Sequence, residues 1–376
     1  MKTKLFFLVS LFLMVLTSEK SFGQSHLSIE TINAFSLNNN KLSVDTLQNI
    51  AVYLPPNYAS SNKSYPVVYY LPGFTSPINE FLFGEYSGFE LQKAVDSLIE
   101  RQLINEMIIV LVDDNTFLGG SFYVNSSING NWEDYIAYDI VQYIDKKYKT
   151  NPSPNSRAIA GNSMGGFGAL HIAMKHPDIF GMVYSLSPGL FDVNGILNSR
   201  FLTSYQNLSE MQQAINKYFN EPELNEIERY KYLTANLRYG PYEGYLKGFL
   251  LAYGSAFCPD SELETPPFFN LPDTSVTETN IDDKQFKCWI NGFGGWEEKI
   301  KEHHSNLKKI NIILDCGLND GWITDGTKYV SNLLEKNQIK VKTLWFDGGH
   351  TDKLHIRMKE HMLPSISKYF ETQTSN

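Results

Sequence analysis

The sequence is poor in cysteine, has no cluster of lysine or arginine, and beyond its N-terminus contains no apolar run long enough to cross a membrane. Three cysteines are too few for a small domain stapled by disulfides, so a hydrophobic core must stabilise the chain. The net charge of -9, without a basic cluster, argues against nucleic acids and anionic membranes as partners. The length of 376 residues suits one large sheet-centred domain with an insertion.

The N-terminus has the pattern of an export signal. Basic residues precede the apolar run 5–16, and the small residues Ser21 and Gly23 stand at the spacing that a signal peptidase requires. The run is too short to span a bilayer comfortably. We therefore expect residues 1–23 to be a cleaved signal peptide and residues 24–376 to form the mature protein, either secreted or periplasmic.

An oxidising compartment of this kind permits one disulfide bond. Cys258 and Cys288 lie in the same loop-rich region, and we predict that they pair. Cys316 follows an apolar run and is expected to be a small buried side chain.

Short apolar runs alternate with segments of helical periodicity along most of the chain. The runs are typical of strands buried in a parallel sheet, and they cover residues 65–71, 107–112, 158–160, 182–186, 310–314 and 341–346. Helices are predicted within residues 88–103, 132–148, 164–176, 327–334 and 354–370, the last interrupted at Pro364. Residues 26–37 and 47–54 alternate in polarity and predict two antiparallel strands. The pattern predicts an α/β fold with a doubly wound, mostly parallel sheet.

The alternation stops between about residues 187 and 307. The first half of this stretch reads as helical, and the second half is rich in proline, glycine and aromatic residues. The aromatic residues argue against disorder. We predict an insertion that caps the carboxyl edge of the sheet, which is where open α/β sheets bind ligands.

The segment 157–180 reads RAIAGNSMGGFGALHIAMKHPDIF and contains the motif G-x-S-x-G around Ser163. An apolar strand precedes the motif and a helical segment follows it, which is the context of a nucleophile elbow. Gly161 and Gly165 have no Cβ atom, so neighbouring chain can approach closely. A glycine-rich turn without chemistry is the alternative, but the flanking strand and helix favour Ser163 as a nucleophile at the N-terminus of a helix.

A serine hydroxyl needs a base to take its proton and an acid to orient that base. Asp320, in D-C-G-L-N-D, follows one predicted strand, and His350, in D-G-G-H, follows the next. The chain order Ser, Asp, His is that of the G-x-S-x-G hydrolases, and all three residues follow strands at the same edge of the predicted sheet. We predict a triad of Ser163, Asp320 and His350. The alternatives are Asp315 or Asp325 as the acid and His355 as the base.

The tetrahedral intermediate of such a reaction needs two backbone N–H donors. Met164, the residue after the nucleophile, is expected to supply one. The loop after the strand 65–71 should supply the other, and we assign it to Phe74 because Pro72 has no N–H.

No metal or other cofactor is expected. Several histidines lie in the C-terminal part, but their spacing matches no H-E-x-x-H or comparable motif. Adjacent His303 and His304 would also point apart on a helix. These histidines are His303, His304, His350, His355 and His361.

The aromatic residues Trp289, Phe293 and Trp296 in the expected insertion admit two interpretations. For most of them, a core beneath a long loop is the better one. The alternative is that one of them lines a pocket for an acyl group or an aromatic ester.

Four motifs together resemble the putative-esterase family of α/β-hydrolases: the elbow G-N-S-M-G-G-F-G-A-L, the K-H-P-D-I-F after it, C-G-L-N-D and G-G-H. The likeness runs from about Ile50 to Tyr369 and is weakest in the insertion. The family includes feruloyl and acetylxylan esterases, S-formylglutathione hydrolases and mycolyltransferases. The resemblance implies an α/β-hydrolase fold, with Ser163 as nucleophile, Asp320 as acid and His350 as base.

Two further features bear on this resemblance. W-E-D-Y at residues 132–135 and the following Asp139 match a segment that is common in secreted members. Pro72 stands where many members have histidine, a difference that bears on how the oxyanion loop is held.

These features favour an exported serine carboxylesterase that works through an acyl-enzyme. The resemblance suggests small-molecule or polysaccharide-linked esters as substrates, for example feruloyl or acetyl groups on plant polysaccharides, and this step rests on analogy. The alternatives are an acyltransferase with a sugar or lipid hydroxyl as acceptor and a non-catalytic binding protein on a hydrolase scaffold. The complete set of three groups argues against the last, because binding does not require them.

Overall fold

The computed structural model describes residues 23–85, 88–114, 116–195, 199, 209–213, 215–216, 225–238, 242–272 and 284–374. The expected signal peptide, apart from Gly23, and part of the expected insertion lie outside the described residues. Within the described part of the chain, no helix is both long and apolar enough to cross a membrane.

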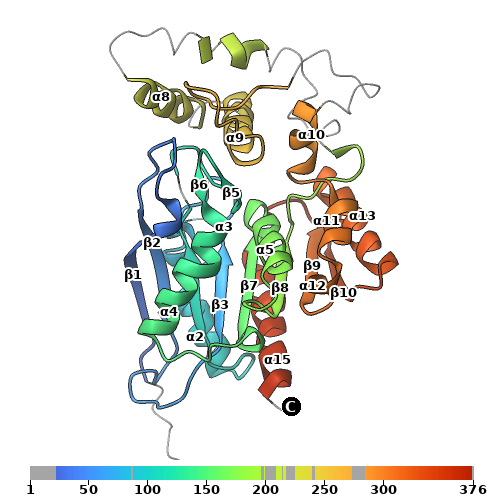
Figure 1. Cartoon of the computed structure of the whole chain (residues 1–376). Helices are drawn as coiled ribbons and strands as arrows, with labels where there is room; N and C mark the ends of the chain where they lie inside the picture. The colour runs from blue at the N-terminus through green and yellow to red at the C-terminus, as the bar shows by residue number, and fades with distance from the viewer. Residues whose placement is uncertain are drawn as a thin grey trace, which may run out of the picture.

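An eight-stranded sheet organises the described part of the chain (Figure 1). Its order is β1 (His26–Asn33), β2 (Leu47–Leu54), β4 (Ile108–Val112), β3 (Val67–Leu71), β7 (Arg157–Asn162), β8 (Met182–Leu186), β9 (Asn311–Gly317) and β10 (Val341–Phe346). All neighbours from β4 to β10 are parallel, whereas β2 runs antiparallel to both β1 and β4. The predicted mostly parallel sheet is confirmed. β5 (Asn125–Ser126) and β6 (Gly130–Asn131) form a small separate ladder.

The chain reverses its direction across the sheet at β3. From β3 it passes to β4 on one side, then returns to β7 on the other side, after which β8, β9 and β10 follow in order. Such a reversal leaves a crevice at the carboxyl ends of the strands, because the connections on its two sides depart in opposite directions. Leu71 lies opposite Gly161 in the register of β3 and β7. The loop after β3 and the turn after β7 therefore lie side by side at this crevice.

Helices cover both faces of the sheet (Figure 1). Along β3, Val67 and Tyr69 join the core on one face, while Val68 and Tyr70 join the core on the other. The first face is covered by α3 (Trp132–Asp134), the π-helical η2 (Tyr135–Ile140), α4 (Val141–Lys147), α5 (Met164–Lys175) and α13 (Trp322–Lys336). The second is covered by α1 (Asn79–Leu82), α2 (Leu91–Glu100), α14 (Leu354–Arg357), the π-helical η4 (Met358–Met362) and α15 (Leu363–Thr374).

Most predicted elements are present, with shifted ends. The helix predicted at 132–148 is formed by α3, η2 and α4 in succession. The strand predicted at 26–37 stops at Asn33 and gives way to a short 3-10 turn, η1 (Phe35–Leu37). α13 begins at Trp322 instead of 327, because Gly321 has a φ of 58° and lets the chain turn directly into a helix.

The predicted interruption at Pro364 is wrong. The chain is helical from Leu354 to Thr374, and Pro364 is the second residue of α15. A proline lacks the N–H that the preceding turn would use, and its ring needs room there. The π-helical η4 directly precedes α15, and its wider turn supplies that room.

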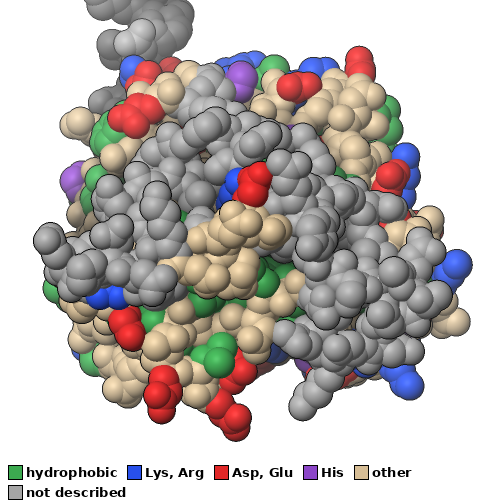
Figure 2. Space-filling view, turned by 90° about the horizontal axis from the view of Figure 1, so that it is seen from above, with side chains coloured by type: hydrophobic (Ala, Val, Ile, Leu, Met, Phe, Trp, Pro, Cys, Tyr) green, Lys and Arg blue, Asp and Glu red, His purple; other side chains and the backbone are tan. Residues whose placement is uncertain are grey.

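Helices from the expected insertion lie in two places. α8 (Glu226–Arg238) and α9 (Tyr242–Phe257) lie at the end of the molecule where α5 begins, with α10 (Lys284–Asn291) beside them (Figure 1). α11 (Trp296–Glu302) packs instead against α13, and α12 (His304–Leu307) packs against α5. Seen from the end that carries α8 and α9, acidic and basic side chains are interspersed among the described residues (Figure 2).

The cysteines behave as predicted. Cys258, directly after α9, and Cys288, in α10, form a disulfide bond with a Cα–Cα distance of 5.3 Å. Cys316 is free and buried in β9, where burial raises the pKa of its thiol to about 12. The disulfide therefore joins two helices of the expected insertion, and the third thiol belongs to the core of the sheet.

Candidate active site

Ser163 lies in a sharp turn between β7 and α5. Its φ of 55° and ψ of −119° are unusual for a residue with a Cβ atom. Strain of this kind is concentrated at functional sites. The Ser163 N–H donates to Leu186 O (2.9 Å), and the Ser163 carbonyl accepts from Gly189 N (3.1 Å). Both bonds tie the turn to the end of β8 and the loop after it.

The two glycines of the elbow motif are required by close packing. A Cβ atom on Gly161 would lie 2.3 Å from Gly165 O, and one on Gly165 would lie 1.9 Å from Leu71 O. Neither distance is possible for a real side chain, because backbone atoms occupy the space. The start of α5 can therefore sit directly on the end of β3 only with glycine at these positions.

The structure brings the three predicted triad residues together. His350 Nε2 lies 2.8 Å from Ser163 Oγ, and His350 Nδ1 lies 2.9 Å from Asp320 Oδ2. The Asp320 side chain is 4% exposed and the His350 side chain 35% exposed. With Nδ1–H donating to the shielded carboxylate, Nε2 is left as the acceptor for the serine proton. The arrangement can activate a hydroxyl nucleophile.

Backbone contacts fix the two loops that carry Asp320 and His350. Asn319 N donates to Gly348 O (3.0 Å), which joins the loop after β9 to the loop after β10. Asp320 N donates to Thr324 Oγ1 (3.0 Å), which ties the acid to the first turn of α13. The relative position of acid and base is therefore held by the backbone and not by the side chains alone.

The alternative acids and base lie elsewhere. Asp315 is fully buried in β9, where Arg357 donates to both of its oxygens (2.8 and 3.0 Å) and Tyr184 Oη donates as well. Burial raises the pKa of the Asp315 carboxyl. Asp325 is exposed on the first turn of α13, and His355 lies on α14. The residue hydrogen-bonded to Ser163 Oγ is His350, which is not one of these three.

The two predicted oxyanion donors belong to segments that flank Ser163. Met164 is the first residue of α5, where backbone N–H groups have no partner within the helix. The loop after β3 lies against the serine, because a Cβ atom on Gly73 would lie 3.3 Å from Ser163 Cβ. Phe74 is the next residue of that loop. The partial positive charge at the N-terminus of α5 is directed at the same place.

Sequence reasoning missed residues 119–123. Tyr123 Oη donates to Pro72 O (2.8 Å), and Thr75 N donates to Gly119 O (2.7 Å), so this segment holds the loop after β3. Its sequence, G-G-S-F-Y, reads as an ordinary glycine- and serine-rich loop. A contact between residues 51 positions apart leaves no local pattern that could have revealed it.

The three aromatic residues singled out in the expected insertion are buried. Trp289 and Trp296 are 0% and 1% exposed, which confirms the core interpretation for both. Phe293 is also buried, but its ring approaches the elbow: a Cβ atom on Gly189 would lie 2.5 Å from it. Gly189 is the residue whose N–H donates to Ser163 O. Of the three aromatics, Phe293 is thus the one in contact with the loop that touches the serine.

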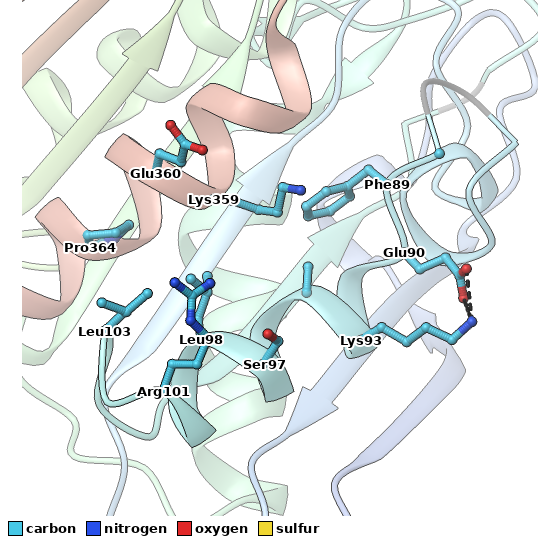
Figure 3. A pocket seen from close by; sticks show the side chains of 12 residues that line it. Phe89, Glu90, Lys93, Ser97, Leu98, Arg101, Leu103, Lys359, Glu360 and Pro364 are labelled. Carbon is cyan, nitrogen blue, oxygen red and sulfur yellow. Dashed lines mark hydrogen bonds and ion pairs between the residues drawn. The ribbon is translucent and has the colours of Figure 1, made fainter.

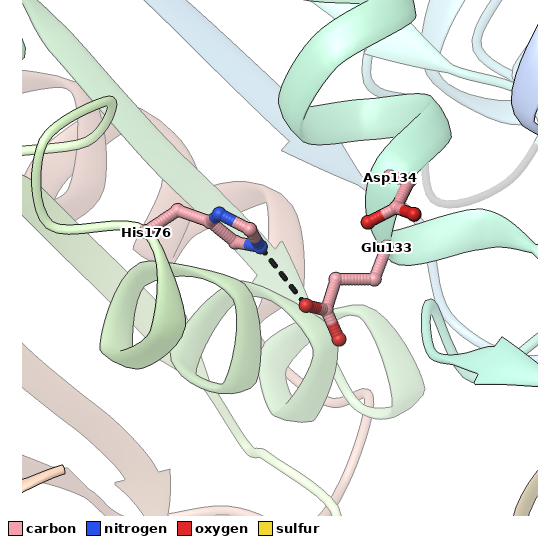
Figure 4. A group of neighbouring side chains, drawn as sticks. All are labelled: Glu133, Asp134 and His176. Atoms are coloured by element: carbon pink, nitrogen blue, oxygen red, sulfur yellow. Dashed lines mark hydrogen bonds and ion pairs between the residues drawn. The ribbon is translucent and has the colours of Figure 1, made fainter.

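Among the described residues, Glu133, Asp134 and His176 are the one group placed to hold a metal, with donor atoms within 4.8 Å of one another (Figure 4). Glu133 already bonds to His176 Nε2 (2.9 Å), His171 Nε2 (3.0 Å) and Lys175 Nζ (2.6 Å). Burial raises the pKa of the Glu133 carboxyl, but these bonds outweigh it and hold the pKa well below its usual range. The Lys175 ammonium supplies the positive charge that a metal would bring. The network ties α3 to the helix that follows the elbow.

A groove of about 650 Å³ lies between α2 and the segment formed by η4 and α15 (Figure 3). Arg101 and Lys359 line it together with apolar residues such as Phe89 and Leu98. It lies on the face of the sheet opposite α5, and none of the predicted site residues lines it. The groove is therefore separate from the site at Ser163.

Residues 43–225 match the model of the family described as "Putative esterase". An esterase of Mycobacterium tuberculosis (strain ATCC 25618 / H37Rv) is 30% identical over 129 residues, which cover 34% of this chain. The aligned part spans only 26% of the length of that relative.

Solved structures with a similar fold extend over almost the whole chain. A ferulic acid esterase has a TM-score of 0.57 at 19% identity, over 93% of this chain and 99% of that chain. An S-formylglutathione hydrolase of Staphylococcus aureus has a TM-score of 0.53 at 13% identity, over 93% of this chain and 100% of that chain. The predicted α/β-hydrolase fold is confirmed, and residues 43–225 resemble the family described as "Putative esterase".

Proposed function

We propose that this protein is an exported serine carboxylesterase. One observation carries the proposal: Ser163 Oγ, the His350 ring and Asp320 form a continuous hydrogen-bond chain of 2.8 and 2.9 Å at a strained turn. The match of residues 43–225 to an esterase family supports the same reaction. Export is proposed from the N-terminal pattern of residues 1–23.

In the proposed mechanism, Ser163 Oγ attacks the ester carbonyl carbon while His350 Nε2 takes the hydroxyl proton. The N–H groups of Phe74 and Met164 stabilise the tetrahedral oxyanion. The His350 imidazolium then protonates the alcohol oxygen as the C–O bond breaks, which leaves an acyl-enzyme on Ser163. Asp320 keeps the Nδ1–H tautomer and stabilises the imidazolium. Water, deprotonated by His350, attacks the acyl carbonyl, and collapse releases the acid and restores Ser163.

Feruloyl or acetyl esters on plant polysaccharides are the proposed substrates. A ferulic acid esterase is among the solved structures with the same fold. Phe293, which contacts the loop beside the serine, belongs to a group of packed rings that includes Phe191 and Trp322. Phe293 and Phe191 are buried, so the partly exposed Trp322 is the ring of this group that offers apolar surface to an acyl group. Rates on a panel of feruloyl, acetyl and longer acyl esters measure this preference.

The proposed reaction is tested with the mature chain, residues 24–376, and a short p-nitrophenyl ester. We expect hydrolysis by the wild type and a loss of at least about 10³-fold in Ser163→Ala. Ser97→Ala, the same change on α2 in the remote groove, should leave the rate unchanged. Full activity in Ser163→Ala would exclude Ser163 as the nucleophile. Ester turnover that requires an added alcohol acceptor would instead indicate an acyltransferase.

A further inference from the structure

The loop that carries Phe74 is held by a second loop, residues 119–123. We propose that Tyr123 is a positioning residue that keeps the oxyanion loop, residues 72–75, aimed at Ser163, and that Asp114 keeps Tyr123 in place. This role rests on the proposed function, because an oxyanion loop matters only if Ser163 forms a tetrahedral intermediate.

Tyr123 reaches the first residue of the oxyanion loop. Its hydroxyl donates to Pro72 O (2.8 Å), and the whole residue is buried. Pro72 has no N–H, so its carbonyl is the only backbone group through which a hydrogen bond can hold it. The Tyr123 ring is itself wedged against α5, because a Cβ atom on Gly168 would lie 2.5 Å from it. Tyr123 thereby connects the elbow helix to the oxyanion loop.

The next peptide groups of the loop are fixed as well. Ser76 N donates to Gly73 O (3.1 Å), and Thr75 N donates to Gly119 O (2.7 Å). Gly73 O and the Phe74 N–H belong to one planar trans peptide and point in opposite directions, so fixing the oxygen also aims the N–H. With Pro72 O held by Tyr123, successive peptide planes are fixed on both sides of Phe74.

These contacts hold both loops, residues 72–75 and 119–123, in a backbone conformation that they would not adopt without them. Phe122 and Tyr123 both have a φ of 57°, and Thr75 has a φ of 63°. Residues with a Cβ atom disfavour this region, above all bulky or β-branched ones. Such conformations persist only where the surroundings over-determine them, and they cluster at sites where geometry is part of the mechanism. Here the strained residues lie in the two loops that contact each other beside Ser163.

Asp114, two residues after the end of β4, anchors the strained segment. Its Oδ2 accepts from Ser121 N (3.0 Å) and from Ser121 Oγ (3.1 Å), and Ser121 Oγ accepts from Tyr123 N (3.0 Å). Asp114 is 2% exposed, so these bonds are not shared with bulk water. The carboxylate thus orders the backbone immediately before the Tyr123 side chain.

Packing holds the same segment from the other side. The Phe122 ring lies 6.1 Å from the Phe74 ring and 5.1 Å from that of Phe249 on α9. A Cβ atom on Gly120 would lie 2.6 Å from the Met164 sulfur. Residues 119–123 therefore contact both residues whose N–H groups are the proposed oxyanion donors.

Tyr123→Phe tests this role because it removes only the hydroxyl. We expect kcat for a p-nitrophenyl ester to fall by about 10- to 100-fold, with KM changed by less than about twofold, because the lost bond serves the transition state more than binding. Tyr135→Phe is the matched control: Tyr135 is equally buried, and its hydroxyl has no partner among the described residues. Amide hydrogen exchange in residues 73–76 should become faster in Tyr123→Phe and stay unchanged in Tyr135→Phe.

The outcomes separate this role from the proposed function. Unchanged kcat and unchanged exchange in Tyr123→Phe overturn the positioning role, while Ser163→Ala still tests the esterase. Equal losses of kcat in Tyr123→Phe and Tyr135→Phe overturn it too, because they indicate a general loosening of the core. If the wild type hydrolyses no ester, the proposed function fails, and the amide hydrogen exchange of residues 73–76 alone decides whether Tyr123 holds the loop.

Discussion

At the scale of single residues, the loops around Ser163 contain several residues with a strained backbone. Ser163, Phe122, Tyr123 and Thr75 have φ values between 55° and 63°. Each such residue costs roughly 1–3 kcal/mol and persists only where surrounding contacts hold it. The strain at Ser163 belongs to the G-x-S-x-G turn itself, whereas Phe122, Tyr123 and Thr75 lie in the two neighbouring loops.

The role of the acid is tested by Asp320→Asn, which keeps the shape of the side chain and removes its charge. We expect kcat to fall by at least about 10³-fold, with little change in KM, because asparagine neither stabilises the imidazolium nor selects the Nδ1–H tautomer of His350. Asp325→Asn, the same change at an exposed position of α13, should leave kcat unchanged. Initial rates on a p-nitrophenyl ester measure both variants. A normal rate in Asp320→Asn would exclude Asp320 as the acid.

The residues of the candidate site that follow strands were predictable from their order along the chain. Ser163, Asp320 and His350 each follow an apolar strand, and parallel strands deliver such residues to one edge of a sheet. Tyr123 follows no strand, and an aromatic residue with a positive φ contradicts local preference. Its role depends on a contact between the loops after β3 and β4, which no periodicity in the sequence predicts.

At the scale of elements, the turn after α10 depends on one partly buried amine. Lys299 Nζ, in α11, donates to three carbonyl oxygens of that turn: Asn291 (2.7 Å), Gly292 (2.8 Å) and Gly294 (2.6 Å). Two aromatic rings also lie within 6 Å of the ammonium. This turn contains Phe293, whose ring packs against Gly189 in the loop beside Ser163. Lys299 thus helps to place an aromatic side chain near the serine.

Burial lowers the pKa of the Lys299 amine to about 7, from 10.5 in the unfolded chain. Between these values the unfolded chain binds more protons than the folded one, so the free energy of unfolding should rise with pH. From pH 7 to pH 9 we expect it to rise by about 2 kcal/mol more in the wild type than in Lys299→Met.

Urea denaturation at each pH measures this difference in slope. Lys301→Met, an exposed position of the same helix, should keep the wild-type dependence on pH. Parallel slopes in the wild type and Lys299→Met would show that the Lys299 amine does not titrate in this range.

Element ends were less predictable than the elements themselves. Proline usually ends a helix, so the sequence predicts an interruption at Pro364. In the structure, the π-helical turn η4, directly before α15, makes room for the proline ring, so the helix continues through Pro364. Such an adjustment depends on packing against α2 and β3, because Met358 and Met362 lie in the same core as Leu91 and Val68. Tertiary contacts of this kind leave no trace in local periodicity.

At the scale of the whole molecule, strand order creates the site. The reversal between β4 and β7 around β3 places the oxyanion loop beside the elbow. Buried cores on both faces of the sheet keep this juxtaposition fixed. Alternating strands and helices made the sheet predictable from the sequence. The stretch 187–307 lacks that alternation, so the packing of α11 and α12 beside the sheet was not predictable.

The central claim is that His350 activates Ser163 as a nucleophile, and covalent trapping tests it most directly. The protein comprising residues 24–376 is treated at neutral pH with diethyl p-nitrophenyl phosphate, whose phosphorus accepts the serine oxygen as p-nitrophenolate leaves. Peptide mass spectrometry should find one diethylphosphoryl group on the tryptic peptide 158–175, at Ser163. The group should be absent from Ser163→Ala and formed much more slowly in His350→Ala. No adduct on the wild type, or an adduct on a different serine, would contradict the account.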